Sequence, residues 1–146
     1  MSKTTKHALR GALACVAVLL VAGLSSAPAL ASDAYLNVSK SGQYIGHGYF
    51  WDSPTGSSCT SGQEVIAAKD TVGGDGYSIQ TDIWYTNSEG YSFHLSTVAT
   101  AAAQSTKESQ KCVSSLSDGY TVQVRSCARN SSGALSYCSP ISKPTS

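Results

Sequence analysis

The chain has 146 residues, with ten Lys or Arg, nine Asp or Glu and a formal net charge of +1 at pH 7. Three of the basic residues precede position 11, so residues 32–146 carry seven basic and nine acidic side chains and a net charge of −2. This mildly acidic balance argues against nucleic acid and anionic membranes as partners, and the length is enough for one domain.

The N-terminal segment has the three parts of an export signal. A basic start precedes an unbroken apolar run at 11–24, and a small-residue tail ends in Ala-Leu-Ala. The run is typical of a signal peptide and short for a membrane span, which disfavours the alternative of an N-terminal anchor. We therefore predict a signal peptide at 1–31, cleaved before Ser32, and a single secreted, extracellular β domain at 32–146 without a membrane span.

Four cysteines follow the predicted cleavage site: Cys59, Cys112, Cys127 and Cys138. An even number of cysteines in a small exported chain predicts two disulfides. The spacings contain no C-x-x-C pair, which argues against a zinc site. We expect no metal and no cofactor.

Three candidate strands come first along the predicted mature chain, at 34–38, 43–51 and 64–69. Turn-rich sequences at 52–56 and 70–76, with Asp, Pro and Gly, separate them from their neighbours.

The next segment predicts a β-hairpin. Residues 77–85 and 91–95 alternate large apolar with polar side chains on either side of an Asn-Ser-Glu-Gly turn. One register places the large apolar side chains on a single face, apart from Trp84, and a slip of one residue would destroy that agreement. The predicted pairs are Tyr85 with Tyr91, Ile83 with Phe93, Thr81 with Leu95, and Asp82 with His94.

Residues 98–111 are the helix-prone run of the chain, with clustered Ala, Glu and Lys. They predict either one short helix or the end of a strand followed by a loop.

A second hairpin is predicted near the C-terminus, where residues 120–124 alternate and an Asn-Ser-Ser-Gly turn follows. If Ser131 opposes Ala134, Cys127 opposes Cys138 at a distance that a disulfide can span. The register therefore predicts a Cys127–Cys138 disulfide, which leaves Cys59–Cys112 as the second. The same register pairs Ala128 with Tyr137 and Val124 with Ile141. It predicts one apolar face, formed by Tyr120, Val122, Val124, Ala128, Leu135, Tyr137 and Ile141.

About seven short strands separated by turns, without alternating helices, predict an all-β fold. The expected architecture is a small immunoglobulin-like or fibronectin-like β-sandwich with two disulfides, and a small β-barrel is the alternative.

Asp82, His94 and Trp84 form the first candidate site, on the face of the predicted hairpin away from the core. An Asp–His pair supplies two members of a hydrolase triad, but no serine lies in a G-x-S-x-G context. Cross-strand Asp–His contacts are also ordinary in sheets. We predict that the protein is not an enzyme, and retain these three residues as candidate binding residues.

Aromatic residues near the N-terminus form the second candidate site. The three consecutive aromatics at 49–51 cannot all face one core, so Tyr49 and Trp51, or the residue between them, must point outward or lie under a loop. Tyr35 and Leu36 belong to a short alternating segment at 32–41 that could add a strand to a partner's sheet.

The signal ending in PALA-S and the strand sequences DGYSIQTDIWY and GYTVQVRSCARNSSGALSYCS resemble the small secreted two-disulfide proteins of actinobacteria. The resemblance spans about residues 70–139. It implies a binding role, because that group includes inhibitors of extracellular hydrolases and carriers of small molecules. The chain also resembles the small adaptor subunit of umbrella toxin particles, which joins a lectin-type subunit to a toxin-bearing shaft. No functional residue follows from either resemblance.

We predict a secreted, non-catalytic binding module that acts through protein–protein contacts, as an adaptor subunit of an extracellular antibacterial toxin assembly. Its partner would be another secreted protein or protein assembly. The alternatives are a proteinaceous inhibitor of an extracellular protease or glycosidase, which would use the loop at 52–63, and a carrier of small molecules.

Overall fold

Eight β-strands account for most of the chain that the computed structural model describes, which comprises residues 33–52, 59, 60, 62–101, 108–114 and 120–144. No helix occurs among these residues, so none is long and apolar enough to cross a membrane. The predicted signal peptide lies outside them. The strands are β1 (Ala34–Lys40), β2 (Gln43–Trp51), β3 (Gln63–Asp70), β4 (Tyr77–Thr86), β5 (Ser92–Ala99), β6 (Glu108–Ser114), β7 (Thr121–Asn130) and β8 (Leu135–Ser136).

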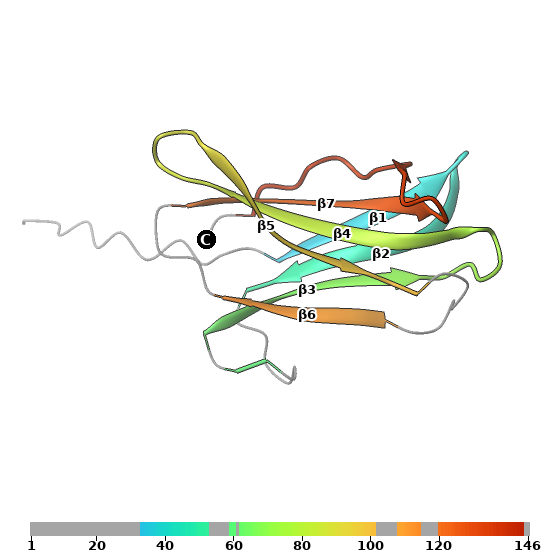
Figure 1. Cartoon of the computed structure of the whole chain (residues 1–146), viewed down its shortest axis with the longest axis horizontal. Helices are drawn as coiled ribbons and strands as arrows, with labels where there is room; N and C mark the ends of the chain where they lie inside the picture. Colours follow the sequence, from blue (N-terminus) through green and yellow to red (C-terminus); the bar gives the residue numbers. More distant parts are fainter. Residues whose placement is uncertain (1–32, 53–58, 61, 102–107, 115–119, 145–146) are drawn as a thin grey trace, which may run out of the picture.

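The strands form two antiparallel sheets of four, in the orders β1-β2-β3-β6 (sheet A) and β5-β4-β7-β8 (sheet B). The order of sheet A can be followed down Figure 1. Strands β2, β3 and β6 take the places of A, B and E in an immunoglobulin-like Greek key, and β5, β4, β7 and β8 take those of C′, C, F and G. Strand β1 is an additional edge strand beside β2. The predicted β-sandwich with two disulfides is confirmed, and the barrel alternative is wrong.

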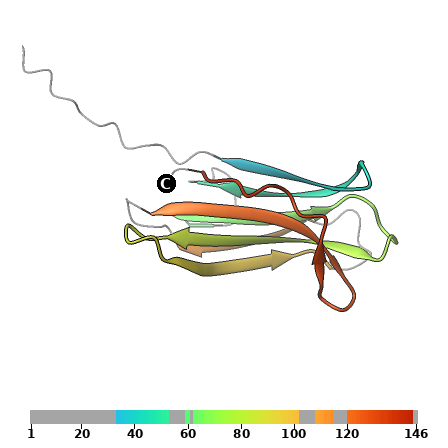
Figure 2. The same cartoon turned by 90° about the horizontal axis from the view of Figure 1, so that it is seen from above.

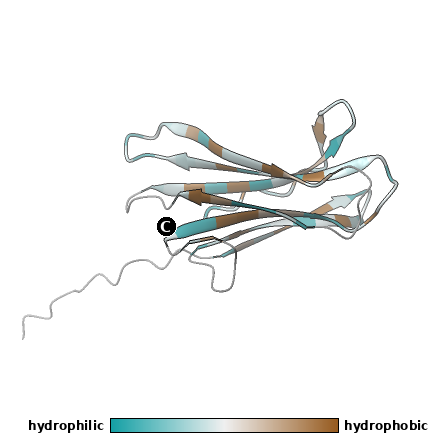
Figure 3. Ribbon diagram, turned by 60° about the horizontal axis from the view of Figure 1, so that its bottom comes forward, coloured by the Kyte–Doolittle hydropathy of each residue, from teal (hydrophilic) through white to brown (hydrophobic). Residues whose placement is uncertain are grey.

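The core lies between the two sheets and follows the alternation of the strands, visible as brown and teal segments in Figure 3. Phe50 is fully buried in it, so the middle residue of the aromatic run faces inward while Tyr49 and Trp51 face outward. Burial of a side chain of this size contributes roughly 2–3 kcal/mol. The fully buried apolar residues of the core are Val38, Phe50, Ile66, Ala68, Ile83, Val122, Val124 and Ala128.

A polar cluster joins the two sheets inside this core. The hydroxyl of Thr81 on β4 donates to the carbonyl oxygen of Ala67 on β3 at 2.8 Å and lies 2.8 Å from the hydroxyl of Ser126 on β7. Gly48 on β2 faces both hydroxyls, and a Cβ at this position would collide with them. The glycine is therefore required by the close approach of the two hydroxyls rather than by its backbone freedom.

The β4–β5 hairpin differs in register from the prediction. Tyr85 pairs with Phe93 rather than Tyr91, and Asp82 pairs with Thr97 rather than His94. The register shifts between Ile83 and Trp84, where β5 carries one extra residue, a β-bulge. The bulge changes which side chains of β5 face the core, so Ser96 and Val98 are buried while Phe93 is 45% exposed.

The C-terminal hairpin also departs from the predicted register. Ala128 pairs with Ser136 instead of Tyr137, and Val124 bridges to Ser142 instead of Ile141. Between these two contacts the C-terminal segment carries two extra residues. Tyr137, which lies between them, has a φ of 50°, a left-handed conformation that interrupts the regular pairing. The prediction of apolar packing for Leu135, Tyr137 and Ile141 is wrong, because all three are exposed.

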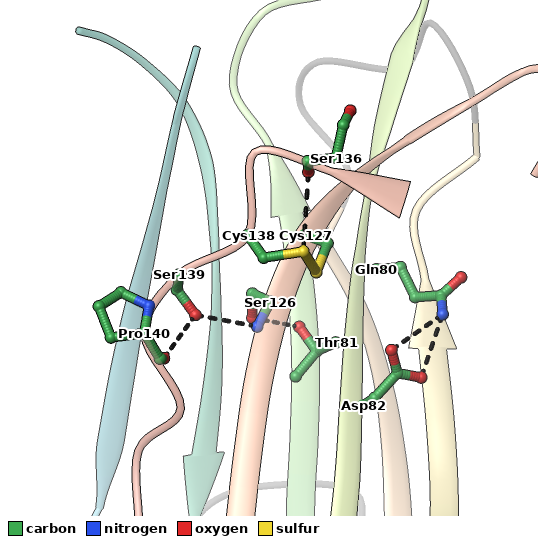
Figure 4. Close-up of a disulfide and its surroundings, with 9 residues drawn as sticks. All are labelled: Gln80, Thr81, Asp82, Ser126, Cys127, Ser136, Cys138, Ser139 and Pro140. Atoms are coloured by element: carbon green, nitrogen blue, oxygen red, sulfur yellow. Dashed lines mark hydrogen bonds between the residues drawn. A yellow bond between two sulfur atoms is a disulfide. The ribbon is translucent and has the colours of Figure 1, made fainter. Parts of the chain in front are cut away.

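Both predicted disulfides are confirmed. Cys127–Cys138 connects β7 to the segment after β8 and lies beside the hydrogen bond that the Ser126 backbone N–H donates to the Ser139 hydroxyl, as Figure 4 shows. Cys59–Cys112 connects the loop before β3 to β6 across 53 residues of sequence. Neither crosses between the sheets, so the hydroxyl cluster of Thr81 and Ser126 supplies a polar link across the core.

The helix considered for residues 98–111 is contradicted at both ends. Strand β5 continues to Ala99 and β6 begins at Glu108, with residues 102–107 outside the described part. The strand end of the alternative is present in β5, and residues 108–111 belong to β6, a strand that was not predicted. The turn predicted at 70–76 is present, and most of the turn at 52–56 lies outside the described residues.

Candidate binding surface

Five aromatic side chains gather on the outer face of sheet A, near β1. Alternation along β2 places His47, Tyr49 and Trp51 on the face opposite the core, and Tyr35 projects beside them from the neighbouring strand. Tyr44, at the other end of β2, completes the group by contacting the His47 ring. We call these five residues the aromatic cluster.

The rings of the aromatic cluster stack on one another. Tyr35 lies over His47 with ring centroids 4.6 Å apart, and Tyr49 lies over Trp51 at 4.4 Å. The His47 and Tyr49 rings connect the two pairs at 6.4 Å. Each ring contact limits the rotamers of its members, which reduces the side-chain freedom that a partner would have to restrict on binding.

Hydrogen bonds from β6 fix the middle of the cluster. Tyr49 donates its hydroxyl hydrogen to Glu108 and accepts a hydrogen bond of 2.9 Å from the Gln110 side-chain amide. The same amide donates to Glu108 at 2.7 Å, which closes a ring of three polar groups. Burial, together with the bond to Glu108, raises the pKa of Tyr49 above its usual range. This tyrosine is therefore a neutral anchor at all physiological pH values.

The other end of the cluster contains a second hydrogen-bonded pair. The Tyr44 hydroxyl contacts Nδ1 of His47. Burial, with a smaller effect of the bond to Tyr35, raises the pKa of Tyr44 to about 12. Burial lowers the pKa of His47, although the nearby Glu108 charge acts in the opposite direction. Both groups are consequently favoured in their neutral forms.

The cluster combines a buried base with an exposed rim. Tyr49 is only 4% exposed and packs with Val65, Ala67 and Cys59 in a small apolar group on the outer side of β3. Tyr35, by contrast, is 62% exposed. Tyr44 and Trp51 are 41% and 38% exposed. Because Cys59 belongs to this group, the Cys59–Cys112 disulfide supports the surface from one side.

The second candidate site lies on the outer face of sheet B, on the opposite side of the sandwich. Asp82 is buried, and its two carboxylate oxygens each accept a bond of 3.0 Å from the Gln80 side chain, drawn in Figure 4. Thr97 donates its hydroxyl hydrogen to the same carboxylate. The Arg125 guanidinium lies 5.3 Å from the centroid of the Trp84 ring.

The geometry at His94 differs from that of a catalytic triad. Its Nε2 lies 3.0 Å from the Thr97 hydroxyl and 3.6 Å from the Asp82 carboxylate. Since the single hydroxyl hydrogen of Thr97 is donated to Asp82, His94 must donate its Nε2 hydrogen to Thr97. A triad instead requires the acid and the nucleophile at different ring nitrogens. This site therefore holds the carboxylate in place and presents no activated hydroxyl.

The structure separates the predicted binding residues into three groups. Tyr35, Tyr49 and Trp51 belong to the aromatic cluster, whereas Asp82, Trp84 and His94 lie on the opposite face. Leu36 is 5% exposed and packs in the core between the sheets.

Four further residues of the surface were not predicted from the sequence. His47 could have been found, because it shares the alternation of Tyr49 and Trp51. Tyr44 could not be found, because a shift in the β1–β2 register brings it to His47. Glu108 and Gln110 could not be found either, because they lie on a mostly polar strand without apolar alternation.

No group of three or more His, Cys, Asp or Glu side chains that could hold a metal ion occurs among the described residues. Comparisons with protein-family models, with curated proteins and with solved structures find no match to this chain.

Proposed function

We propose that the protein is a secreted, non-catalytic module that binds another extracellular protein through the aromatic cluster. The observation that carries this proposal is the set of mutually stacked rings, hydrogen-bonded at Tyr49 and exposed at Tyr35 and Trp51. Tyrosine and tryptophan are favoured interface anchors, because they bury a large area for little loss of conformational entropy. Rings that are already ordered reduce that entropy cost further.

The proposed role is that of an adaptor in an extracellular assembly. The two disulfides are compatible with an extracellular protein, and the resemblance to the umbrella toxin adaptor suggests the class of assembly. The geometry at His94 favours a binding role over catalysis, since Asp82 and Thr97 compete for one ring nitrogen. The loop considered for an inhibitor lies mostly outside the described residues, so inhibition is left as an outcome of the experiment.

Affinity capture from the culture supernatant of the producing organism tests the proposal. The tagged wild-type protein should recover one or more stoichiometric non-enzyme proteins. The variants Tyr35→Ala and Trp51→Ala should lose them. Tyr91→Ala is the matched control, because Tyr91 is 63% exposed on the β4–β5 hairpin and lies outside the cluster.

Two results would contradict this function. If the cluster variants retain the partner while Tyr91→Ala loses it, the contact surface is on the other hairpin. If the captured protein is a hydrolase whose activity falls on mixing, the protein is an inhibitor rather than an adaptor.

A further inference from the structure

Strand β1 is an edge strand without the features that normally protect an edge. Its segment Ala34–Val38 contains no charge, no proline and no bulge, and its register shift and Lys40 lie at the far end of the strand. Among the described residues, its backbone is paired with β2 only. Unprotected edges of this kind pair readily with another extended chain.

The three other sheet edges carry such protection. Strand β6 has Glu108 and Lys111, and β5 is interrupted by its bulge. Strand β8 has two residues and is soon followed by Pro140. The contrast singles out β1 as the edge available for pairing.

The hydrogen-bonding direction along β1 follows from the neighbouring ladder. Thr71 donates its backbone N–H to Ile45 at 3.1 Å, at the end of the β2–β3 pairing. Main-chain groups in an antiparallel ladder alternate in direction, so Gly46 and Gly48 turn theirs toward β1. Their partners in β1 are Val38 and Leu36.

Tyr35 and Asn37 consequently turn their main-chain N–H and C=O groups toward the free edge, because they alternate with the residues bonded to β2. These groups form a template for one additional strand. A residue of that strand opposite Leu36 would project inward, since paired residues share a face of the sheet.

A groove of about 420 Å³ lies where that inward side chain would project. Leu36 lines it from β1, and Pro140 and Ile141 line it from the C-terminal segment, which runs alongside β7 on the side of β1 in Figure 2. The Ile141 side chain is 50% exposed. The segment is held to β7 by paired backbone bonds of 2.9 Å between Val124 and Ser142.

We infer that β1 accepts an extended, uncharged segment of the partner polypeptide as a fifth strand of sheet A. An apolar side chain of that segment would enter the groove beside Leu36 and Ile141. The occupant is an extended polypeptide rather than a small molecule, because the edge offers alternating backbone donors and acceptors along its length and the groove beside it has room for a side chain. The inference deepens the proposed function and rests on it in one respect, that the partner is a protein.

The test uses phage-displayed random nonapeptides selected on the secreted, oxidised protein. Enriched peptides are then synthesised and titrated by fluorescence anisotropy. The key variant is Asn37→Pro, which removes a backbone donor that faces the edge and should leave the β1–β2 ladder intact. Asn37→Thr is its matched control, because it changes the side chain and keeps the backbone donor.

We expect enriched peptides with an apolar residue between uncharged neighbours, and protection of the Tyr35 and Asn37 amides from hydrogen exchange on binding. Asn37→Pro should weaken binding by about tenfold or more, and Asn37→Thr by less than about threefold. If Asn37→Pro fails to fold, Ile141→Arg serves instead, since it places a charge in the groove from an exposed position and should cause a similar loss.

Three results would overturn the inference. The first is that no peptide is enriched. The second is that bound peptides are insensitive to Asn37→Pro and Ile141→Arg but sensitive to Trp51→Ala, which would leave the proposed function standing without the edge. The third is that the protein is a dimer which Asn37→Pro converts to monomer, because the occupant would then be a second copy of this chain.

Discussion

Gly48→Ala should be among the most damaging single-methyl changes in the protein. The new Cβ would lie far inside van der Waals contact with the hydroxyl oxygens of Thr81 and Ser126, and 3.0 Å from the carbonyl oxygen of Ala67. All of these atoms are buried between the sheets. Neither hydroxyl can withdraw without breaking the hydrogen bonds that join β3, β4 and β7.

The expected cost has two parts. Overpacking a close-packed core by one methyl group costs about 1–3 kcal/mol. Breaking the Thr81 bonds to Ala67 and Ser126 adds about 1 kcal/mol for each bond. The sum, about 3–5 kcal/mol, corresponds to a fall in melting temperature on the order of 12 °C or more for a domain of this size.

The assay is thermal and urea unfolding of four oxidised proteins: wild type, Gly48→Ala, the double variant Thr81→Ala/Ser126→Ala, and the triple variant. Removing both hydroxyl groups makes room for the methyl, so Gly48→Ala should cost far less in that background. The resulting coupling energy should exceed about 2 kcal/mol, against the few tenths expected of independent sites. Equal costs of Gly48→Ala in both backgrounds would refute this reasoning.

Three further outcomes are expected. Replacing Cys59 and Cys112 by serine should lower the free energy of unfolding by about 4 kcal/mol. Removing the other disulfide, which closes a shorter loop, should lower it by about 3 kcal/mol. Urea denaturation measures both values, and the opposite ranking would contradict the loop-entropy argument. Asp70→Asn should stabilise the protein at neutral pH and have little effect below pH 3. Burial raises the pKa of Asp70, so the stability that the protonated carboxyl contributes is lost as the pH rises through that raised pKa. If this is wrong, unfolding at several pH values would show a constant difference in stability between the variant and the wild type. His47 should titrate by NMR with a pKa below its ordinary value, and the stability that it contributes above pH 6.5 should be lost as the pH falls through this lowered pKa. A titration midpoint at or above 6.5 would contradict a half-buried ring that favours its neutral form.

The architecture could be predicted from the sequence because alternation and turn chemistry are local. The bounds of β2 match the predicted 43–51, and the inward direction of Phe50 was one of the two alternatives that three consecutive aromatics allow. The pairing of Cys127 with Cys138 was also predicted correctly, although the register on either side was not. A shift of one residue in the strand register nearby leaves a disulfide in place, whereas it changes every cross-strand side-chain pair.

The two errors of register share one physical cause, because a bulge or a left-handed residue shifts the pairing of the strands and leaves the alternation in the sequence unchanged. Leu95 is the extra residue of β5, and nothing in its sequence distinguishes it from a paired residue. Tyr137 adopts a positive φ, which cannot be predicted from the sequence because the residue is not a glycine. Strand β6 was missed for another reason, because it is an edge strand with a mostly polar sequence. Its Glu108 could therefore not be linked with Tyr49 before the order of strands was known.

Tyr35 is the point at which the two proposed contacts meet. Its ring stacks on His47 in the aromatic cluster, while its main-chain groups face the free edge and the residue borders the groove. A partner that adds a strand to β1 would therefore place its outward side chains against rings that are already ordered. Strand pairing alone is insensitive to sequence, and an aromatic surface alone does not fix direction. Because the two surfaces are contiguous, one partner can obtain its orientation from the edge and its selectivity from the cluster. The polar face around Asp82 lies on the other side of the sandwich, so under the proposed adaptor role it would be available to a second subunit.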